Sequence, residues 1–146
     1  MFARILAGGV AGAAAMFLLG WLIYGMLLSS YFASTVSPAG KAVMNMETPN
    51  FVPLIIAEIV FGVLFAFIFD YWASIRTFAG GAKGGAIIMF LMSLGFSMQM
   101  EAFFKDMHVG SPYIPMVVDL ICAVILGALG GGAIGLINGL MDKQSG

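Results

Sequence analysis

The chain has 146 residues, of which 62% are hydrophobic and only 9% charged, and its net charge is −1. Soluble proteins carry roughly 25% charged residues, so this composition excludes an ordinary soluble domain and indicates an integral membrane protein. Its partner is then the lipid bilayer. No block of like charges points to nucleic acid. Membrane helices of about 20 residues and their links use up this length, so we expect a single transmembrane domain over residues 1–146 and no water-facing catalytic domain.

Four apolar stretches are long enough to cross a bilayer. They cover about residues 5–28, 51–72, 81–104 and 113–141. The first follows Arg4 and resembles a secretory signal, but it is longer than the roughly 7 to 15 apolar residues of such a signal, so we expect a retained helix. The fold class is therefore an all-α membrane protein with four transmembrane helices in an antiparallel bundle.

The links between these stretches differ in length. In the long first link, Pro38 after Ser37 predicts a short surface helix that runs to Met46. The second link, residues 73–80, is tight and predicts that the second and third helices are antiparallel neighbours. The third link, residues 105–112, is also short.

The basic residues predict the orientation, because cytoplasmic loops carry the excess of Lys and Arg. Four of the six basic residues fall on one side of the predicted bundle and two on the other. The first side, with both termini, is then cytoplasmic, in a multi-pass protein of the bacterial inner membrane. The two sets are Arg4, Arg76, Lys83 and Lys143 against Lys41 and Lys105.

An internal repeat of two helical hairpins is one interpretation of the order of the helices. Aligning the first helix with the third matches Gly8 with Gly81 and Gly12 with Gly85. Aligning the second with the fourth sets Glu58 against Asp119. Such hairpins are related by a pseudo-two-fold axis in some transporters, but apolar sequences also match by chance.

Glycines at four-residue steps predict close helix packing, because residues at i and i+4 lie on one helix face. Each step drifts about 40° around a helix of 3.6 residues per turn. We therefore expect the part from Asp119 to Gly127 to face the bundle interior and the later glycines to pack against a different helix. The glycines concerned are Gly127, Gly131, Gly135 and Gly139 in the last span and Gly8 and Gly12 in the first.

Acidic residues inside the spans are the candidates for chemistry, since each costs about 2.5 kcal/mol or more at a membrane centre. Glu58 and Asp119 lie two turns into their spans, and Glu101 and Gln99 reach the same level from the third helix. Three interpretations stay open. The acids can share a proton or cation, form interhelical hydrogen bonds to Gln99, Ser93, Ser97 or backbone carbonyls, or face the outer water.

The remaining polar residues suggest no catalytic constellation. His108 could form a metal site with Glu101 or Asp106, but a lone loop histidine is usually only solvated, so we expect no metal and no cofactor. The single Cys122 reads as a small buried residue. Three further features are expected to be structural: pairing of Asp70 with Arg76 or Lys83, a hydrogen bond from Asn138 across a helix pair, and helix packing by the glycines around Lys83.

The pattern resembles small four-helix integral membrane proteins of bacteria that form a family of unknown function. The residues that carry the resemblance are Gly8-Gly9, Gly20-Trp21, Tyr24-Gly25, Ile68-Phe69-Asp70-Tyr71-Trp72 and the glycines of residues 81–85. The resemblance implies a four-helix membrane fold and no particular activity.

Two functions are compatible with the sequence. The first is helix association, as a homo-oligomer or as a small subunit of a membrane complex, without enzyme activity. The alternative is a small proton- or cation-linked transporter or channel that uses Glu58, Asp119 and Glu101, with Gln99 beside them.

Overall fold

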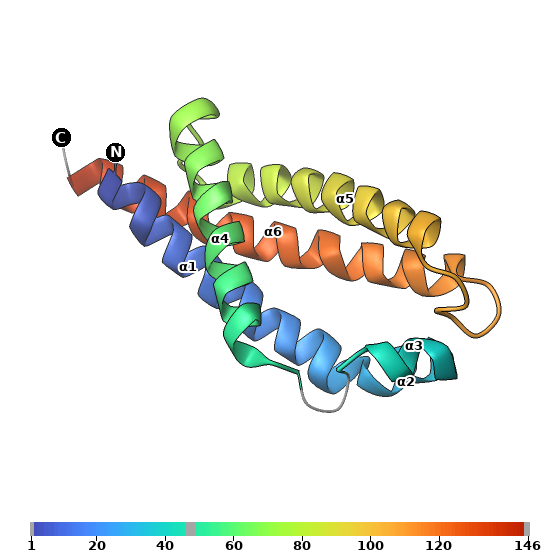
Figure 1. The fold of residues 1–146 in the computed structure, drawn as a ribbon. Helices are drawn as coiled ribbons and strands as arrows, with labels where there is room; N and C mark the ends of the chain where they lie inside the picture. Colours follow the sequence, from blue (N-terminus) through green and yellow to red (C-terminus); the bar gives the residue numbers. More distant parts are fainter. Residues whose placement is uncertain (1, 46–48, 145–146) are drawn as a thin grey trace.

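The computed structural model describes residues 2–45 and 49–144, and helices make up its long elements (Figure 1). Four helical segments are long and apolar enough to cross a membrane, and they agree with the expected spans to within three residues. These segments are Phe2–Leu27, Phe51–Trp72, Phe78–Phe103 and Tyr113–Lys143. The elements are α1 (Phe2–Gly20), the π-helix η1 (Trp21–Leu27), α2 (Ser29–Thr35), α3 (Pro38–Val43), α4 (Phe51–Phe67), the π-helix η2 (Ile68–Trp72), α5 (Phe78–Phe103) and α6 (Tyr113–Gln144).

Capping side chains begin three of the helices. The Ser37 hydroxyl accepts a hydrogen bond from the Gly40 amide at 3.0 Å, so the expected short helix after Ser37 is present as α3. It ends at Val43, and its predicted end at Met46 lies outside the described residues. Asn50 caps α4 and Thr77 caps α5 in the same way. Each cap satisfies an amide that has no partner inside the helix.

The helices pack in the order α5, α6, α1, α4, with α4 crossing α1 (Figure 1). The prediction that the second and third helices are neighbours is therefore wrong, because α4 packs mainly on α1 and α5 packs on α6. The link is tight, but Ser74 adopts a positive φ of 50° and redirects the chain within it. The glycine face of α5 then pairs with α6. The predicted repeat of two hairpins is not seen either. A two-fold axis that relates the hairpins would match the α1–α6 contact with an α5–α4 contact of similar extent, and there is none.

Glycines bring the first half of α5 into backbone contact with the middle and the second half of α6. A Cβ atom on Gly85 would overlap the carbonyl oxygen of Gly127, and a Cβ atom on Gly127 would overlap that of Gly85. Gly81 and Gly131 exclude side chains from each other in the same way. Such small-residue rows let two helices approach unusually closely.

The glycine row of α6 packs on α5 and on the two residues that precede it, so the expected division of the row between two helices is wrong. Gly135 faces the Thr77 carbonyl and Gly139 faces the Arg76 carbonyl, one and two steps beyond the contact with Gly81. Rows of i+4 residues are inclined to the helix axis, and two such rows align when the helices cross at an angle. Residues 77, 81 and 85 also follow one another at four-residue steps, so they rotate around their helix as the α6 glycines rotate around α6, and the two rows stay in contact.

Helix α1 is the centre of the other half of the fold. Gly12 lies against the Ile134 side chain of α6, and a Cβ atom on Gly62 of α4 would overlap the Gly9 carbonyl of α1. Buried apolar side chains from α1, α4, η2 and α6 form the core around this crossing. They are Ile5, Met16, Phe65, Ala66, Phe69 and Ile134.

An isolated antiparallel bridge joins the first and third links. Val36 pairs with His108, the Ser37 amide donates to the Met107 carbonyl at 3.0 Å, and the Val109 amide donates to the Thr35 carbonyl at 2.8 Å. The Ser37 hydroxyl donates to the Asp106 carbonyl as well. The segment between α2 and α3 is thus fastened to the loop between α5 and α6.

Candidate functional sites

A four-residue ionic cluster holds the start of α1 to the end of α6. Asp70 of η2 is buried, with 1% of its side chain exposed, and its carboxylate meets Arg4 Nε at 3.1 Å and Arg76 Nη2 at 2.8 Å. Asp142 of α6 pairs with Arg4 at 2.5 Å and with Arg76 at 3.8 Å. Two positive and two negative charges therefore balance. The expected pair of Asp70 with Arg76 is present, whereas Lys83 forms no ion pair with the described residues.

Asn138 lies one helical turn below this cluster. Its side chain is fully buried, and within the described structure neither its amide oxygen nor its nitrogen has a hydrogen-bond partner. A Cβ atom on Gly8 would lie 2.9 Å from the Asn138 oxygen and 3.5 Å from Ala66 Cβ. Gly8, Ala66 and Asn138 thus form the layer beneath Arg4, Asp70 and Asp142, four residues away on each helix. The expected hydrogen bond of Asn138 across a helix pair is not formed among the described residues.

Asp119 joins three helices by hydrogen bonds. The Tyr24 hydroxyl of η1 donates to Asp119 Oδ1 at 2.8 Å, and the Ser93 hydroxyl of α5 donates to Oδ2 at 3.2 Å. Ser93 is one of the partners expected from the sequence, and Tyr24 is not. The π-helix around Tyr24 changes the direction of the side chains that follow α1, and π segments are common at functional sites. The two hydroxyl groups can donate hydrogen bonds to the ionised carboxylate, and a hydroxyl oxygen can accept a hydrogen bond from its protonated form.

Glu101 has a separate setting at the end of α5. Its carboxylate lies 3.3 Å from the His108 Nδ1 atom, beside a cavity of about 300 Å³. Lys105 and Asp106 line the same cavity. Within the described parts of the chain, no group of three or more His, Cys, Asp or Glu side chains is placed to hold a metal ion.

Glu58 and Gln99 have no polar partner among the residues that the structure describes. Glu58 is half-buried on α4, on the face that continues to Gly62 and Phe65, which pack on α1. No residue from 51 to 61 is buried, so the first half of this span is uncovered. Gln99 is exposed on α5. Glu58, Asp119, Glu101 and Gln99 make no polar contact with one another in the described structure, so the shared site that is one of the three interpretations is not seen. Each acid has its own surroundings.

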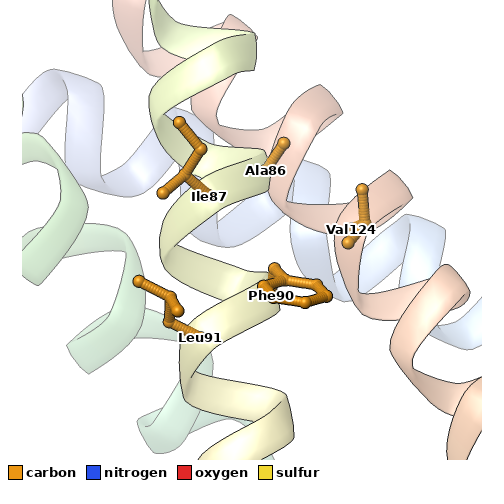
Figure 2. A pocket seen from close by; sticks show the side chains of 5 residues that line it. All are labelled: Ala86, Ile87, Phe90, Leu91 and Val124. Carbon is orange, nitrogen blue, oxygen red and sulfur yellow. The ribbon is translucent and has the colours of Figure 1, made fainter.

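An apolar cavity of about 290 Å³ opens on the outer side of α5 (Figure 2). Four of its five lining side chains come from α5, and the fifth comes from α6. All are apolar, so the cavity offers no hydrogen bond to a ligand. They are Ala86, Ile87, Phe90, Leu91 and Val124.

Sequence reasoning missed the partners Tyr24, Arg4 and Asp142. One signal for the last two is in the sequence, since opposite charges at the predicted cytoplasmic ends of the first and last helices are placed to pair. Tyr24 gives no such signal, because an interfacial tyrosine is usual near the end of a span. Comparison with known proteins finds no matching family model, no matching curated protein and no matching solved structure.

Proposed function

We propose that this chain is a multi-pass protein of the bacterial inner membrane that acts by helix association, as a homo-oligomer or as a small subunit of a membrane complex. In this topology the four spans alternate in direction and both termini are cytoplasmic. The ionic cluster supports the topology, because it gathers Arg4 and Arg76 at one end of the bundle. The resemblance to small four-helix bacterial membrane proteins is in keeping with it.

The observation that carries the proposal is Glu58 on an uncovered half-span. A carboxyl group inside a membrane costs about 2.5 kcal/mol or more unless it is paired or reaches water. Glu58 has no partner in the described part of its own chain, and residues 51–61 include no buried position. A second chain that packs on this half of α4 would bury its apolar side chains and supply a partner for Glu58.

The glycine rows do not serve this association. Gly127, Gly131 and Gly135 are occupied by α5, and Gly8 and Gly12 by α6 of the same chain. The surface offered to a partner is therefore the first half of α4. Its exposed apolar stripe consists of Phe51, Leu54, Ile55 and Phe61, which lie within two helical turns of Glu58 on the same side of the helix.

Glu58→Leu tests the proposal directly. We expect the wild-type protein to have a mass above that of one chain when it is extracted in mild detergent and measured by light scattering with the detergent subtracted. Glu58→Leu should shift it toward the mass of one chain, because the polar contact is lost. Gln99→Leu is the matched control, since it also removes an exposed polar group from a span, and it should leave the mass unchanged. A wild-type protein of single-chain mass, or equal effects of both changes, would refute the proposal.

The second candidate is proton- or cation-linked transport, and Asp119 is the observation that favours it. A carboxylate inside a span with two hydroxyl donors resembles the acids that transport proteins use. Glu58 and Glu101 would then bind the transported proton or cation at separate positions rather than in one site with Asp119. Asp119→Asn should abolish flux in proteoliposomes, and the absence of flux from the wild-type protein would exclude this function.

A further inference from the structure

Lys83 stands directly above the apolar cavity of α5. The four α5 side chains that line the cavity follow Lys83 by three, four, seven and eight residues, so all five share one helix face. Ile87 and Leu91 at the cavity are about 60% exposed, and Lys83 is exposed as well. A cation thus lies one turn from a groove with only apolar walls.

The geometry lets the Lys83 ammonium reach the membrane surface. Helix α5 starts at Phe78, which puts Lys83 about 7.5 Å along the helix at 1.5 Å per residue. Side chains on a helix tilt toward its N-terminus, and a lysine can extend its stem along apolar surface with its charge in the interface. Tyr71 and Trp72, exposed at the end of η2, mark that interface as an aromatic belt does.

Lys83 has no competing partner in the described structure. Arg4 and Arg76, the other cations at this end, are engaged by Asp70 and Asp142. No carboxylate of the described residues forms an ion pair with Lys83. Its charge is therefore available to an external anion.

We propose that Lys83 and the groove of Ala86, Ile87, Phe90, Leu91 and Val124 bind an anionic phospholipid, with the phosphate at Lys83 and one acyl chain in the groove. The charge selects the headgroup and the apolar walls select a hydrocarbon chain. A partner helix would find no hydrogen-bonding group there. The inference rests on the membrane location in the proposed function, but not on association.

Native mass spectrometry of the full chain with bound lipid tests this site. The probes are phosphatidylglycerol and phosphatidylcholine of equal chain length, mixed in equal amounts. We expect the wild type to retain phosphatidylglycerol about fivefold in preference, as one interfacial lysine contributes. Lys83→Gln should reduce the preference to near parity, and Lys83→Arg should keep it. Glycerol phosphate, which has no acyl chain, should not displace the bound lipid.

Lys143→Gln is the matched control, because it removes an exposed lysine from the same end of the bundle but lies on α6 away from the groove. It should leave the preference unchanged. Equal retention of the two lipids by the wild type, an unchanged preference in Lys83→Gln, or an equal loss in Lys143→Gln would overturn the inference. Failure of the proposed membrane location is distinguished by fractionation, since the chain would then be found outside the membranes.

Discussion

Gly85 and Gly127 meet backbone to backbone, and each occupies the space that a side chain on the other would need. This reciprocal contact sets the distance between α5 and α6. The glycine row therefore joins two helices of the same chain, and the surface proposed for other chains lies on α4 instead.

Gly85→Ala and Gly127→Ala should each lower the free energy of unfolding by about 1–3 kcal/mol, the usual cost of overpacking. The added methyl group meets a carbonyl oxygen that belongs to the helix backbone and has little freedom to move. Unfolding in mixed micelles with increasing denaturing detergent measures the change. Gly95→Ala is the control in the same helix, because its added Cβ would meet open space rather than another helix. If Gly95→Ala destabilised the protein as much as the other two, the close contact would not be the cause.

Asp70→Asn should be strongly destabilising, by about 3–5 kcal/mol, because it leaves the two arginines of a buried cluster without their central charge. Asp142→Asn removes a charge from the same cluster, but this side chain is 51% exposed, so we expect about 0–1 kcal/mol. Thermal unfolding in detergent compares the two. The reverse order of the two effects would show that Asp142, rather than Asp70, holds the ends together.

Tyr24→Phe should lower stability by about 0.6 kcal/mol and by no more than about 1.7 kcal/mol, the range measured for hydrogen bonds between membrane helices. The loss should vanish in the Asp119→Ala background, which removes the acceptor, if the two side chains act on each other. Tyr31→Phe is the control, since the Tyr31 hydroxyl is buried without a hydrogen-bond partner in the described structure. A Tyr31→Phe effect as large as that of Tyr24→Phe would argue against a specific bond to Asp119.

Asn138→Leu should leave stability unchanged or raise it. The buried amide has no hydrogen bond among the described residues, and an unpaired buried polar group costs about 1–3 kcal/mol. Asn138→Asp should be destabilising, because it places a charge in the same layer. Both are measured by the same detergent unfolding assay. A loss of more than 1 kcal/mol in Asn138→Leu would show that the amide is paired in the membrane.

The four spans could be predicted from the sequence because their signal is local: about 20 apolar residues bounded by turn-forming residues. The α3 helix after Ser37 was predictable for the same reason, since its cap and its proline are adjacent. The order in which the helices pack could not be predicted from the sequence. A tight link predicts neighbours, but the choice between α4 and α6 as the partner of α5 depends on which faces fit, and glycine rows occur in several helices.

The candidate sites depend on contacts between distant residues, so the sequence could only nominate their members. Asp119 was identified by the cost of an acid inside a span, and its partner Tyr24 was not, because the π-helix η1 sets the direction of that side chain. The apparent common depth of Glu58 and Asp119 did not bring them into contact, because α4 packs mainly on α1 and touches α6 only to a small extent. Equal depth in the membrane fixes only the position of two residues along the bundle axis. For the residues to touch, each helix must also be rotated so that its side chain points toward the other.

Photo-crosslinking from α4 in native membranes tests helix association most directly. With Cys122 replaced by Ser, Leu54→Cys on the exposed stripe of α4 carries a benzophenone, and Leu91→Cys on α5 carries it in the control. We expect a protein adduct of defined mass from Leu54→Cys that is absent from Leu91→Cys and is lost when Glu58→Leu is added. The account would be contradicted if Leu54→Cys gave only the single-chain band, or if its adduct survived Glu58→Leu unchanged.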